Sequence, residues 1–227
     1  SFSESYFQEK FFKEDIIDCQ YKNYPIKDIK KMSSLIEKEK LSGFNVTIPH
    51  KENIISFLDE LSKEANIIEA VNTVVKKNEK WIGHNTDWIG FYESIKPLLQ
   101  KHHKKALVLG SGGASKAIVY ALTKLEISPL VISRKEGYTK YEEITKNLLE
   151  EYLIIVNCTP LGTYPKADEY PPINYELLTN KHLLYDLIYN PSESCFLTYG
   201  KANNANVKNG LEMLKRQAES AWSIWNS

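Results

Sequence analysis

The second half of the chain alternates apolar strands with helices, and this alternation limits the fold more than any other feature. Residues 106–109 form a continuous apolar run, typical of a strand buried on both faces of a parallel sheet. We expect a helix from there to about residue 125 and another near 141–149, with further strands at 130–133, 153–157 and 183–187. The pattern predicts an α/β domain built from βαβ units.

A glycine-rich turn follows the first of these strands and opens its helix, with the sequence Gly110-Ser111-Gly112-Gly113-Ala114-Ser115. Gly110 permits a tight turn, and Gly112 lets the backbone approach a pyrophosphate that binds the free N–H groups of the helix start. Between a buried strand and a helix, this spacing predicts a Rossmann-like, dinucleotide-binding domain. A purely structural turn is the alternative. Ser115 stands where the general fingerprint has its last glycine.

The end of the second strand indicates which nicotinamide cofactor is preferred. NAD-binding folds usually place Asp or Glu there, whereas this chain has Ser133-Arg134-Lys135. Two adjacent cations favour a phosphorylated ribose, because the Arg guanidinium offers a planar pair of donors to phosphate. We therefore predict NADP as the cofactor. The alternative is a solvated Arg-Lys pair on a loop.

The first part of the chain reads as a separate, smaller α/β domain. Phe7, Phe11, Phe12 and Ile16 recur at helical spacing. We expect a strand at 44–48, an amphipathic helix at 53–61 and a hairpin turn at 76–80 between apolar segments. A helix should run from Asp87 to about residue 99, capped by the Asp87 carboxylate. A C-terminal helix at 211–225 should return to this domain. The predicted domains are 1–87 with 209–227, for substrate and catalysis, and 88–208, for NADP.

Composition excludes several classes of partner. Lys plus Arg and Asp plus Glu both number 29, so no net charge draws nucleic acid or an anionic membrane. The three cysteines are far apart and odd in number, which fits free thiols in the cytoplasm and no metal site. No signal peptide or apolar run of membrane-spanning length is visible. The chain opens on Ser1 without Met, and we expect a segment ahead of it.

Two polar stretches supply the groups for acid–base chemistry. The first is Asn45-Val46-Thr47-Ile48-Pro49-His50-Lys51, in which Asn45 and Thr47 share one strand face, and the second is Gly83-His84-Asn85-Thr86-Asp87. An ammonium and a carboxylate can move a proton while a dinucleotide moves a hydride, so Lys51 and Asp87 predict interconversion of an alcohol and a ketone. Asn72 is expected to reach the same site. Abundant amides and hydroxyls with only two arginines, Arg134 and Arg216, favour a polyhydroxylated, non-phosphorylated substrate.

These motifs resemble those of shikimate dehydrogenases over nearly the whole chain. Besides the two polar stretches and the glycine turn, the matching segments are Ala70-Val71-Asn72-Thr73, Asn157-Cys158-Thr159-Pro160-Leu161-Gly162, Asp186-Leu187-Ile188-Tyr189-Asn190-Pro191, and Gly210 with the helix that follows it. The resemblance implies NADPH-dependent, reversible reduction of 3-dehydroshikimate to shikimate, a step in chorismate and aromatic amino acid biosynthesis. It also implies a small-molecule partner only, in a monomer or homodimer.

The same resemblance implies roles for individual residues. Lys51 and Asp87 would form the catalytic pair. The substrate hydroxyls would be bound by Asn72, Asp87 and Gln217, and its carboxylate by Ser1, Ser3, Thr47 and Tyr189. Besides the glycine turn and residues 133–135, the cofactor would contact Asn157, Thr159, Leu187 and Gly210. Tyr189 as a packing residue and Gln217 as a solvated helix residue are the alternatives.

The chain departs from the family pattern at several positions, namely Glu4, Phe7-Gln8, Ser133, Lys135 and Thr163. These changes affect the expected geometry around the 2′-phosphate and the substrate carboxylate, not the reaction. Three other functions stay open: an NAD-dependent quinate/shikimate dehydrogenase, a methylene-tetrahydrofolate dehydrogenase, and a non-catalytic NADP-binding sensor. The missing acid after the second strand disfavours the first, and the presence of both Lys51 and Asp87 disfavours the last.

Overall fold

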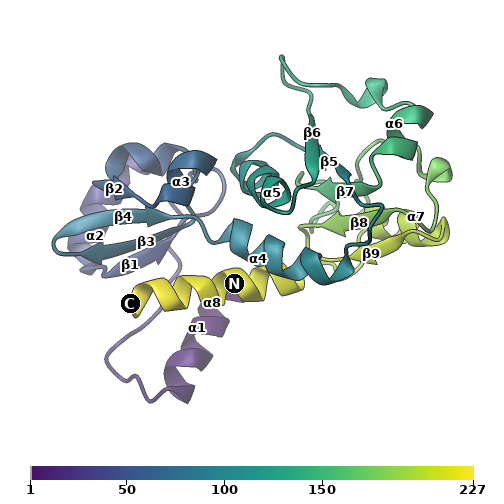
Figure 1. Ribbon diagram of the computed structural model, residues 1–227. Helices are drawn as coiled ribbons and strands as arrows, with labels where there is room; N and C mark the ends of the chain where they lie inside the picture. The colour runs from purple at the N-terminus through teal and green to yellow at the C-terminus, as the bar shows by residue number, and fades with distance from the viewer. Residues whose placement is uncertain (1) are drawn as a thin grey trace. The chain divides into compact units, whose positions relative to one another are not determined.

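A computed structural model describes residues 2–227 (Figure 1). The chain divides into two compact units, Ser1–Ser42 and Gly43–Ser227. The first unit contains α1 (Phe2–Lys13), a 3-10 turn (Ile29–Lys31) and α2 (Met32–Glu39). Phe7 is its buried centre and stacks on Tyr21, with ring centroids 4.9 Å apart. α1 confirms the expected helical spacing for Phe7, Phe11 and Phe12, whereas Ile16 lies beyond the end of the helix. The predicted functional domains, 1–87 with 209–227 and 88–208, stay a prediction.

The second unit begins with a small mixed sheet of four strands. Their order is β1 (Gly43–Asn45), β3 (Thr73–Lys77), β4 (Lys80–His84) and β2 (Glu60–Leu61). β3 and β4 form the predicted hairpin, with Asn78 and Glu79 at its turn at φ of 50° and 62°. Two consecutive positive φ values match the twist of a two-residue hairpin, so the turn is shorter than the predicted 76–80.

Two predicted elements of this part are wrong in their bounds or type. The strand expected at 44–48 ends at Asn45, because the chain then turns and the His50 N–H bonds to the Thr47 carbonyl at 2.9 Å. The helix expected at 53–61 is a 3-10 segment, Asn53–Phe57, followed by β2. Asp59 explains the change, because its backbone N–H and its carboxylate both bond to the Trp81 backbone of β4, at 3.0 and 2.7 Å.

The second sheet is parallel throughout, as the strand–helix alternation predicts. Its order is β6 (Ser128–Ile132), β5 (Lys105–Leu109), β7 (Ile154–Asn157), β8 (Leu183–Asp186) and β9 (Asn206–Lys208). All are joined in parallel register. The sequence reading did not anticipate β9. This sheet confirms the Rossmann-like domain, and the two sheets confirm the predicted two-domain α/β fold class.

Both faces of the parallel sheet are covered, which explains its continuous apolar strands. Ala106 and Val108 pack on one face with α4 (Asp87–Ile95) and α5 (Gly113–Lys124). Leu107 and Leu109 pack on the other with α6 (Lys146–Glu151) and α7 (Cys195–Ala202). The helix expected near 141–149 is instead a 3-10 turn, Tyr141–Glu143, followed by α6, because the Thr145 hydroxyl caps the Leu148 N–H at 3.2 Å and starts a new helix there.

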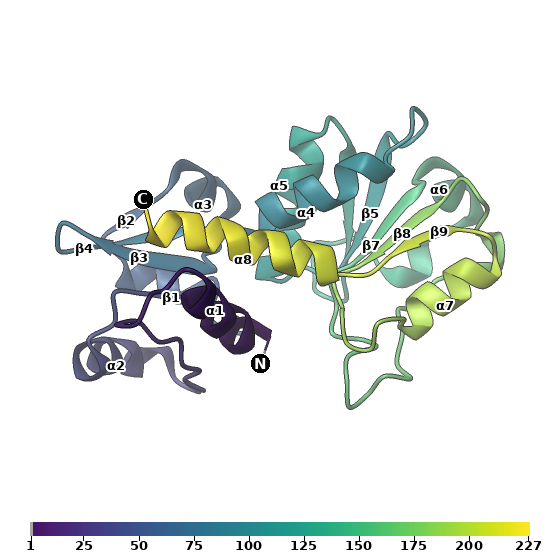
Figure 2. The ribbon, with the colours of Figure 1, turned by 90° about the horizontal axis from the view of Figure 1, so that it is seen from below.

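The C-terminal helix α8 (Leu211–Trp225) runs along α4 and reaches the small sheet (Figure 2). The two helices approach closely at Gly90, where an added Cβ would lie 2.5 Å from the Met213 carbonyl. At its far end the Trp225 indole N–H donates to the Val74 carbonyl of β3 at 3.0 Å. The expected return of this helix to the first sheet is therefore confirmed. Among residues 2–227, no helix is long and apolar enough to span a membrane.

Candidate active site

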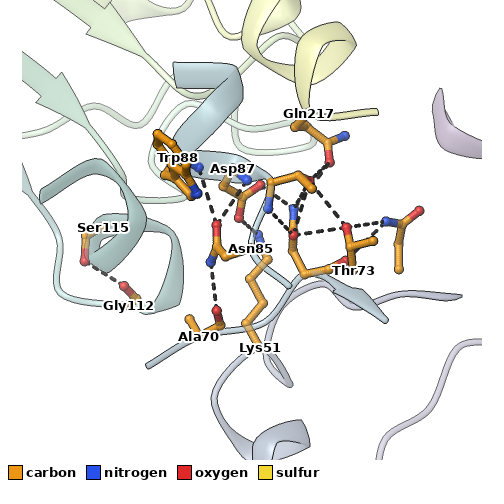
Figure 3. Close-up of polar contacts among 12 residues, drawn as sticks. Lys51, Ala70, Thr73, Asn85, Asp87, Trp88, Gly112, Ser115 and Gln217 are labelled. Atoms are coloured by element: carbon orange, nitrogen blue, oxygen red, sulfur yellow. Dashed lines mark hydrogen bonds and ion pairs between the residues drawn. The ribbon is translucent and has the colours of Figure 1, made fainter. Parts of the chain in front are cut away.

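Lys51 and Asp87 form a close ion pair in the second unit (Figure 3). The Lys51 Nζ lies 2.6 Å from Asp87 Oδ2, and their side chains are 14% and 9% exposed. Asp87 is the first residue of α4, but its carboxylate does not cap the helix as expected. The Asn85 side chain does so, since its Oδ1 accepts from the Asp87 and Trp88 N–H groups at 3.1 and 3.4 Å. The Asp87 carboxylate is thereby left to face Lys51.

Asn72 connects this pair to the C-terminal helix. Its Nδ2 lies 3.0 Å from Asp87 Oδ1, 2.9 Å from Thr86 Oγ1 and 3.3 Å from Gln217 Oε1. Its Oδ1 accepts from the Thr86 N–H at 2.7 Å. Asn72 is buried, so these contacts hold its amide in one orientation. Four predicted site residues, Lys51, Asn72, Asp87 and Gln217, are thus brought together from four separate segments of the sequence.

Two threonines complete the cluster, and sequence reasoning did not single them out. Thr73 and Thr86 are fully buried, with their hydroxyl oxygens 3.3 Å apart. The Asn45 amide donates to Thr73 Oγ1 at 3.2 Å, and Thr86 Oγ1 lies 3.3 Å from Gln217 Oε1. The only signal in the sequence was that each threonine stands beside a candidate polar residue. A buried hydroxyl needs a partner, so each fixes its neighbour's amide.

This cluster combines one ammonium, one carboxylate and several neutral amides and hydroxyls. The ion pair can hold and move a proton, while the neutral groups can donate to and accept from substrate hydroxyls. Such a set suits a polyhydroxylated ring better than a phosphate ester.

The structure describes three of the four residues that are expected to bind the substrate carboxylate. Thr47 is exposed just after β1, and Tyr189 follows β8 and is 41% exposed. Ser3 lies on α1 of the first unit, where its hydroxyl is hydrogen-bonded to Tyr21, whose pKa burial raises. Ser1 lies outside the described residues. The carboxylate-binding role of all four stays a prediction.

The glycine turn has the open geometry that a dinucleotide needs. Gly110 adopts φ of 109°, which favours glycine, and packs against the Cys158 backbone. A Cβ on Gly112 would meet nothing within 4 Å, so the helix start of α5 is open there. Ser115 Oγ donates to the Gly112 carbonyl at 2.6 Å (Figure 3). A Cβ on Gly113 would lie 3.2 Å from that of Lys51, which places the turn beside the lysine.

The other predicted cofactor residues lie at the carboxyl ends of neighbouring strands. After β6, Arg134 and Lys135 are exposed and Ser133 is buried. After β7, Asn157 Oδ1 accepts from the N–H and hydroxyl of Thr159 at 3.0 and 2.6 Å. After β8, Leu187 packs so tightly on Gly210 that an added Cβ would lie 2.1 Å from the Leu187 carbonyl oxygen.

Asp186 joins two of these strand ends and was not predicted as a site residue. It is completely buried and accepts from Asn157 Nδ2 and the Ile188 N–H, both at 3.0 Å, and from the Ser194 hydroxyl. Burial raises the pKa of Asp186 to about 6, and these hydrogen bonds oppose the shift. Its signal in the sequence was an acid directly after the apolar run 183–185.

Comparison with known proteins decides the family. The chain is 39% identical over 205 residues to the shikimate dehydrogenase (NADP(+)) of Caldanaerobacter subterraneus subsp. tengcongensis, a match that covers 82% of this chain and 72% of that protein. The chain belongs to the shikimate dehydrogenase family. The family described as the shikimate dehydrogenase substrate binding domain matches residues 1–74.

Solved shikimate dehydrogenases share the fold over nearly the full chain. Shikimate dehydrogenase 1 from Peptoclostridium difficile superposes with a TM-score of 0.86 at 34% identity, covering 100% of this chain and 87% of that one. The Thermus thermophilus shikimate 5-dehydrogenase, in complex with NADP(H) and shikimate, gives 0.84 at 28% identity, covering 99% and 88%. Membership of the shikimate dehydrogenase family removes the methylene-tetrahydrofolate dehydrogenase alternative.

Proposed function

We propose that this shikimate dehydrogenase family member reversibly reduces 3-dehydroshikimate to shikimate with NADPH. The observation that carries the proposal is the Lys51–Asp87 pair, 2.6 Å apart and beside the glycine turn at Gly113. A proton-moving pair next to a dinucleotide turn is what a ketone–alcohol interconversion requires.

The residues present fit NADPH as the cofactor. The open position at Gly112 and the N–H groups that start α5 suit a pyrophosphate. Arg134 and Lys135, with no acid between 133 and 135, suit a ribose 2′-phosphate. The bound cofactor supplies the hydride of the reaction.

The chain's own groups handle the proton and the orientation of the ring. Reduction of the ketone makes an alkoxide, and the Lys51 ammonium is placed to donate a proton to it. Asp87 holds that ammonium and can accept from a ring hydroxyl, while Asn72 and Gln217 offer an amide each for further hydroxyls. In the reverse direction, Lys51 receives the proton of the alcohol. These contacts tighten as charge develops in the transition state, which favours the reaction over mere binding.

We also propose a cellular location and binding partners for this enzyme. Cys19, Cys158 and Cys195 are free thiols, which supports our proposal of a reducing, cytoplasmic location. We propose shikimate and 3-dehydroshikimate as its small-molecule partners, with the protein acting as a monomer or homodimer.

A spectrophotometric assay tests the function. Purified protein with shikimate should increase the absorbance of reduced nicotinamide far faster with NADP than with NAD, and quinate should be a poor substrate. Preference for NAD and quinate together would instead support the NAD-dependent quinate/shikimate alternative. Tight NADP binding without turnover of either substrate would support the non-catalytic sensor.

A further inference from the structure

The loop that follows β6, residues 133–140, closes on itself. The Ser133 N–H donates to the Thr139 carbonyl at 2.9 Å, and Thr139 forms a parallel bridge with Ile132 of the strand. Gly137, at φ of 82°, lies in the segment that reverses between them. The loop therefore starts and ends at the same strand end, where Arg134 and Lys135 are displayed.

Lys140 reaches back into this loop. Its Nζ donates to the Arg134 carbonyl at 3.4 Å and, more closely, to the Lys135 carbonyl. Its own N–H donates to Glu143 Oε2 at 2.6 Å, which anchors the end of the loop to the turn that follows. The ammonium of Lys140 thus binds the backbone of the two residues whose side chains are the proposed phosphate contacts.

The same segment is also held by two serines. Ser133 Oγ lies 2.8 Å from Ser111 Oγ of the glycine turn, and it accepts from the Lys135 N–H at 3.2 Å. The Ser133 hydroxyl therefore links the 133–135 segment to the glycine turn, and Lys140 binds two of its backbone carbonyls. Both hydroxyl contacts are made by residues that also belong to the proposed cofactor site.

Such a double attachment matters because Arg134 and Lys135 are exposed. Exposed side chains lose conformational entropy when they bind a ligand, and a backbone fixed in advance reduces that cost. The Lys140 charge also adds to the positive field of the loop, against the nearby carboxylates of Glu136, Glu142 and Glu143. A ligand with a dianionic phosphate gains most from both effects.

We propose that Lys140 is a positioning residue that sets selectivity for the 2′-phosphorylated dinucleotide, by holding the backbone of Arg134 and Lys135. The proposal rests on the proposed function, because it concerns the cofactor of that reaction. It assigns to Lys140 no contact with the substrate or with the reacting atoms.

The test compares kcat/KM for NADP and for NAD with shikimate as substrate. In Lys140→Met the value for NADP should fall about tenfold, while the value for NAD should change less than about twofold, because NAD has no 2′-phosphate to recognise. Lys140→Arg should keep most of the preference, since a guanidinium can also donate to two carbonyls. Lys146→Met, which removes an exposed cation that pairs only with Glu150 at 3.7 Å among the described contacts, is the control and should change neither value.

The ratio of the two values does not depend on how much of a variant is folded, so partial misfolding cannot imitate the result. An equal fall with both cofactors in Lys140→Met would show a merely structural role and overturn the proposal. An unchanged ratio would overturn it as well. Binding of 2′,5′-ADP, followed by calorimetry without substrate, should weaken by a similar factor of about ten.

The two proposals can fail separately. If the unaltered protein prefers NADP and Lys140→Met keeps that preference, the inference about Lys140 is wrong and the proposed function stands. If the unaltered protein shows no preference for NADP over NAD, the cofactor assignment fails and the role of Lys140 fails with it.

Discussion

Around Asp87 polar side chains bind one another, whereas around Gly112 the backbone is open and few side chains approach. Asn72, Thr73, Thr86 and Asp87 are all buried and mutually hydrogen-bonded. Gly112 has nothing within 4 Å of a built Cβ, and the nearby cations Arg134 and Lys135 are exposed. In a site made of mutually hydrogen-bonded side chains, substitution of any one of them should disturb the others. A site made of backbone N–H groups depends instead on the free space that is left for the ligand.

The largest expected effect is on the site made of hydrogen-bonded side chains. Lys51→Met removes the ammonium and should lower kcat by roughly 10²- to 10⁴-fold, the usual contribution of a general acid or base. KM for shikimate should change much less, because the proton transfer matters most in the transition state. Steady-state kinetics with NADP measures both.

The matched control is Lys80→Met, which removes an exposed lysine paired with Glu60 at the edge of the small sheet. It should leave kcat unchanged. Near-normal turnover in Lys51→Met would show that Lys51 is not the acid–base group. It would also contradict the expectation that the side-chain cluster is more sensitive to substitution than the glycine turn.

The next effect concerns Asp186, the buried acid of the cofactor side. Its pKa is about 6 in the folded chain against 3.8 as the ordinary value, so between about pH 4 and 6 the unfolded chain binds fewer protons. The free energy of unfolding should therefore fall as pH rises through this range, by up to about 3 kcal/mol from this group.

Asp186→Asn removes that titration. Urea unfolding at pH 4.5 and at pH 7 should show a smaller loss of stability with rising pH in the variant than in the unaltered protein. Ser94→Ala is the control, because it removes a buried hydrogen bond to Tyr185 of the same strand but no carboxylate. Parallel pH profiles for Asp186→Asn and the unaltered protein would contradict the raised pKa.

Two glycines allow the effect of an added methyl group on cofactor binding to be separated from its effect on stability. Gly112→Ala should leave the melting temperature nearly unchanged, because nothing lies near the new methyl group, yet raise KM for NADP about tenfold by crowding the pyrophosphate. Gly210→Ala should instead lower stability by about 1–3 kcal/mol, because its methyl group would meet the Leu187 carbonyl. Thermal melts and NADP titrations of both variants check this. Equal loss of stability in the two would mean that Gly112 is as crowded as Gly210.

The smallest expected effect is at the contact between the two regions. Lys116 of α5 pairs with Glu52 at 3.0 Å and Glu69 at 3.4 Å, next to Lys51 and Ala70. These side chains are partly exposed, so Lys116→Met should cost less than about 1 kcal/mol, and the loss should shrink in high salt. Melting temperatures at low and high salt measure it. A loss of several kcal/mol that ignores salt would show that packing, not charge, joins the regions there.

The sequence predicted the parallel half well because its signal is local. A continuous apolar strand, a glycine turn and a helix stand side by side in residues 106–125. The prediction of a helix at 53–61 was wrong because the apolar residues of this segment are not packed against a core along one helix face. Only Ile54 of the 3-10 segment is buried, and Asp59 bonds to β4. The role of the Asp186 carboxylate was missed because its partner Ser194, which caps the next helix, lies outside the motif that begins at Asp186.

The sequence by itself determined which kinds of group this protein carries and where its strands turn into helices. Apolar runs and glycines act over a few neighbouring residues, so their consequences can be read along the chain. Only the tertiary structure decided which polar groups meet. Asn72 and Gln217 are 145 positions apart, and they touch because α8 packs onto α4 at Gly90, where no larger side chain fits.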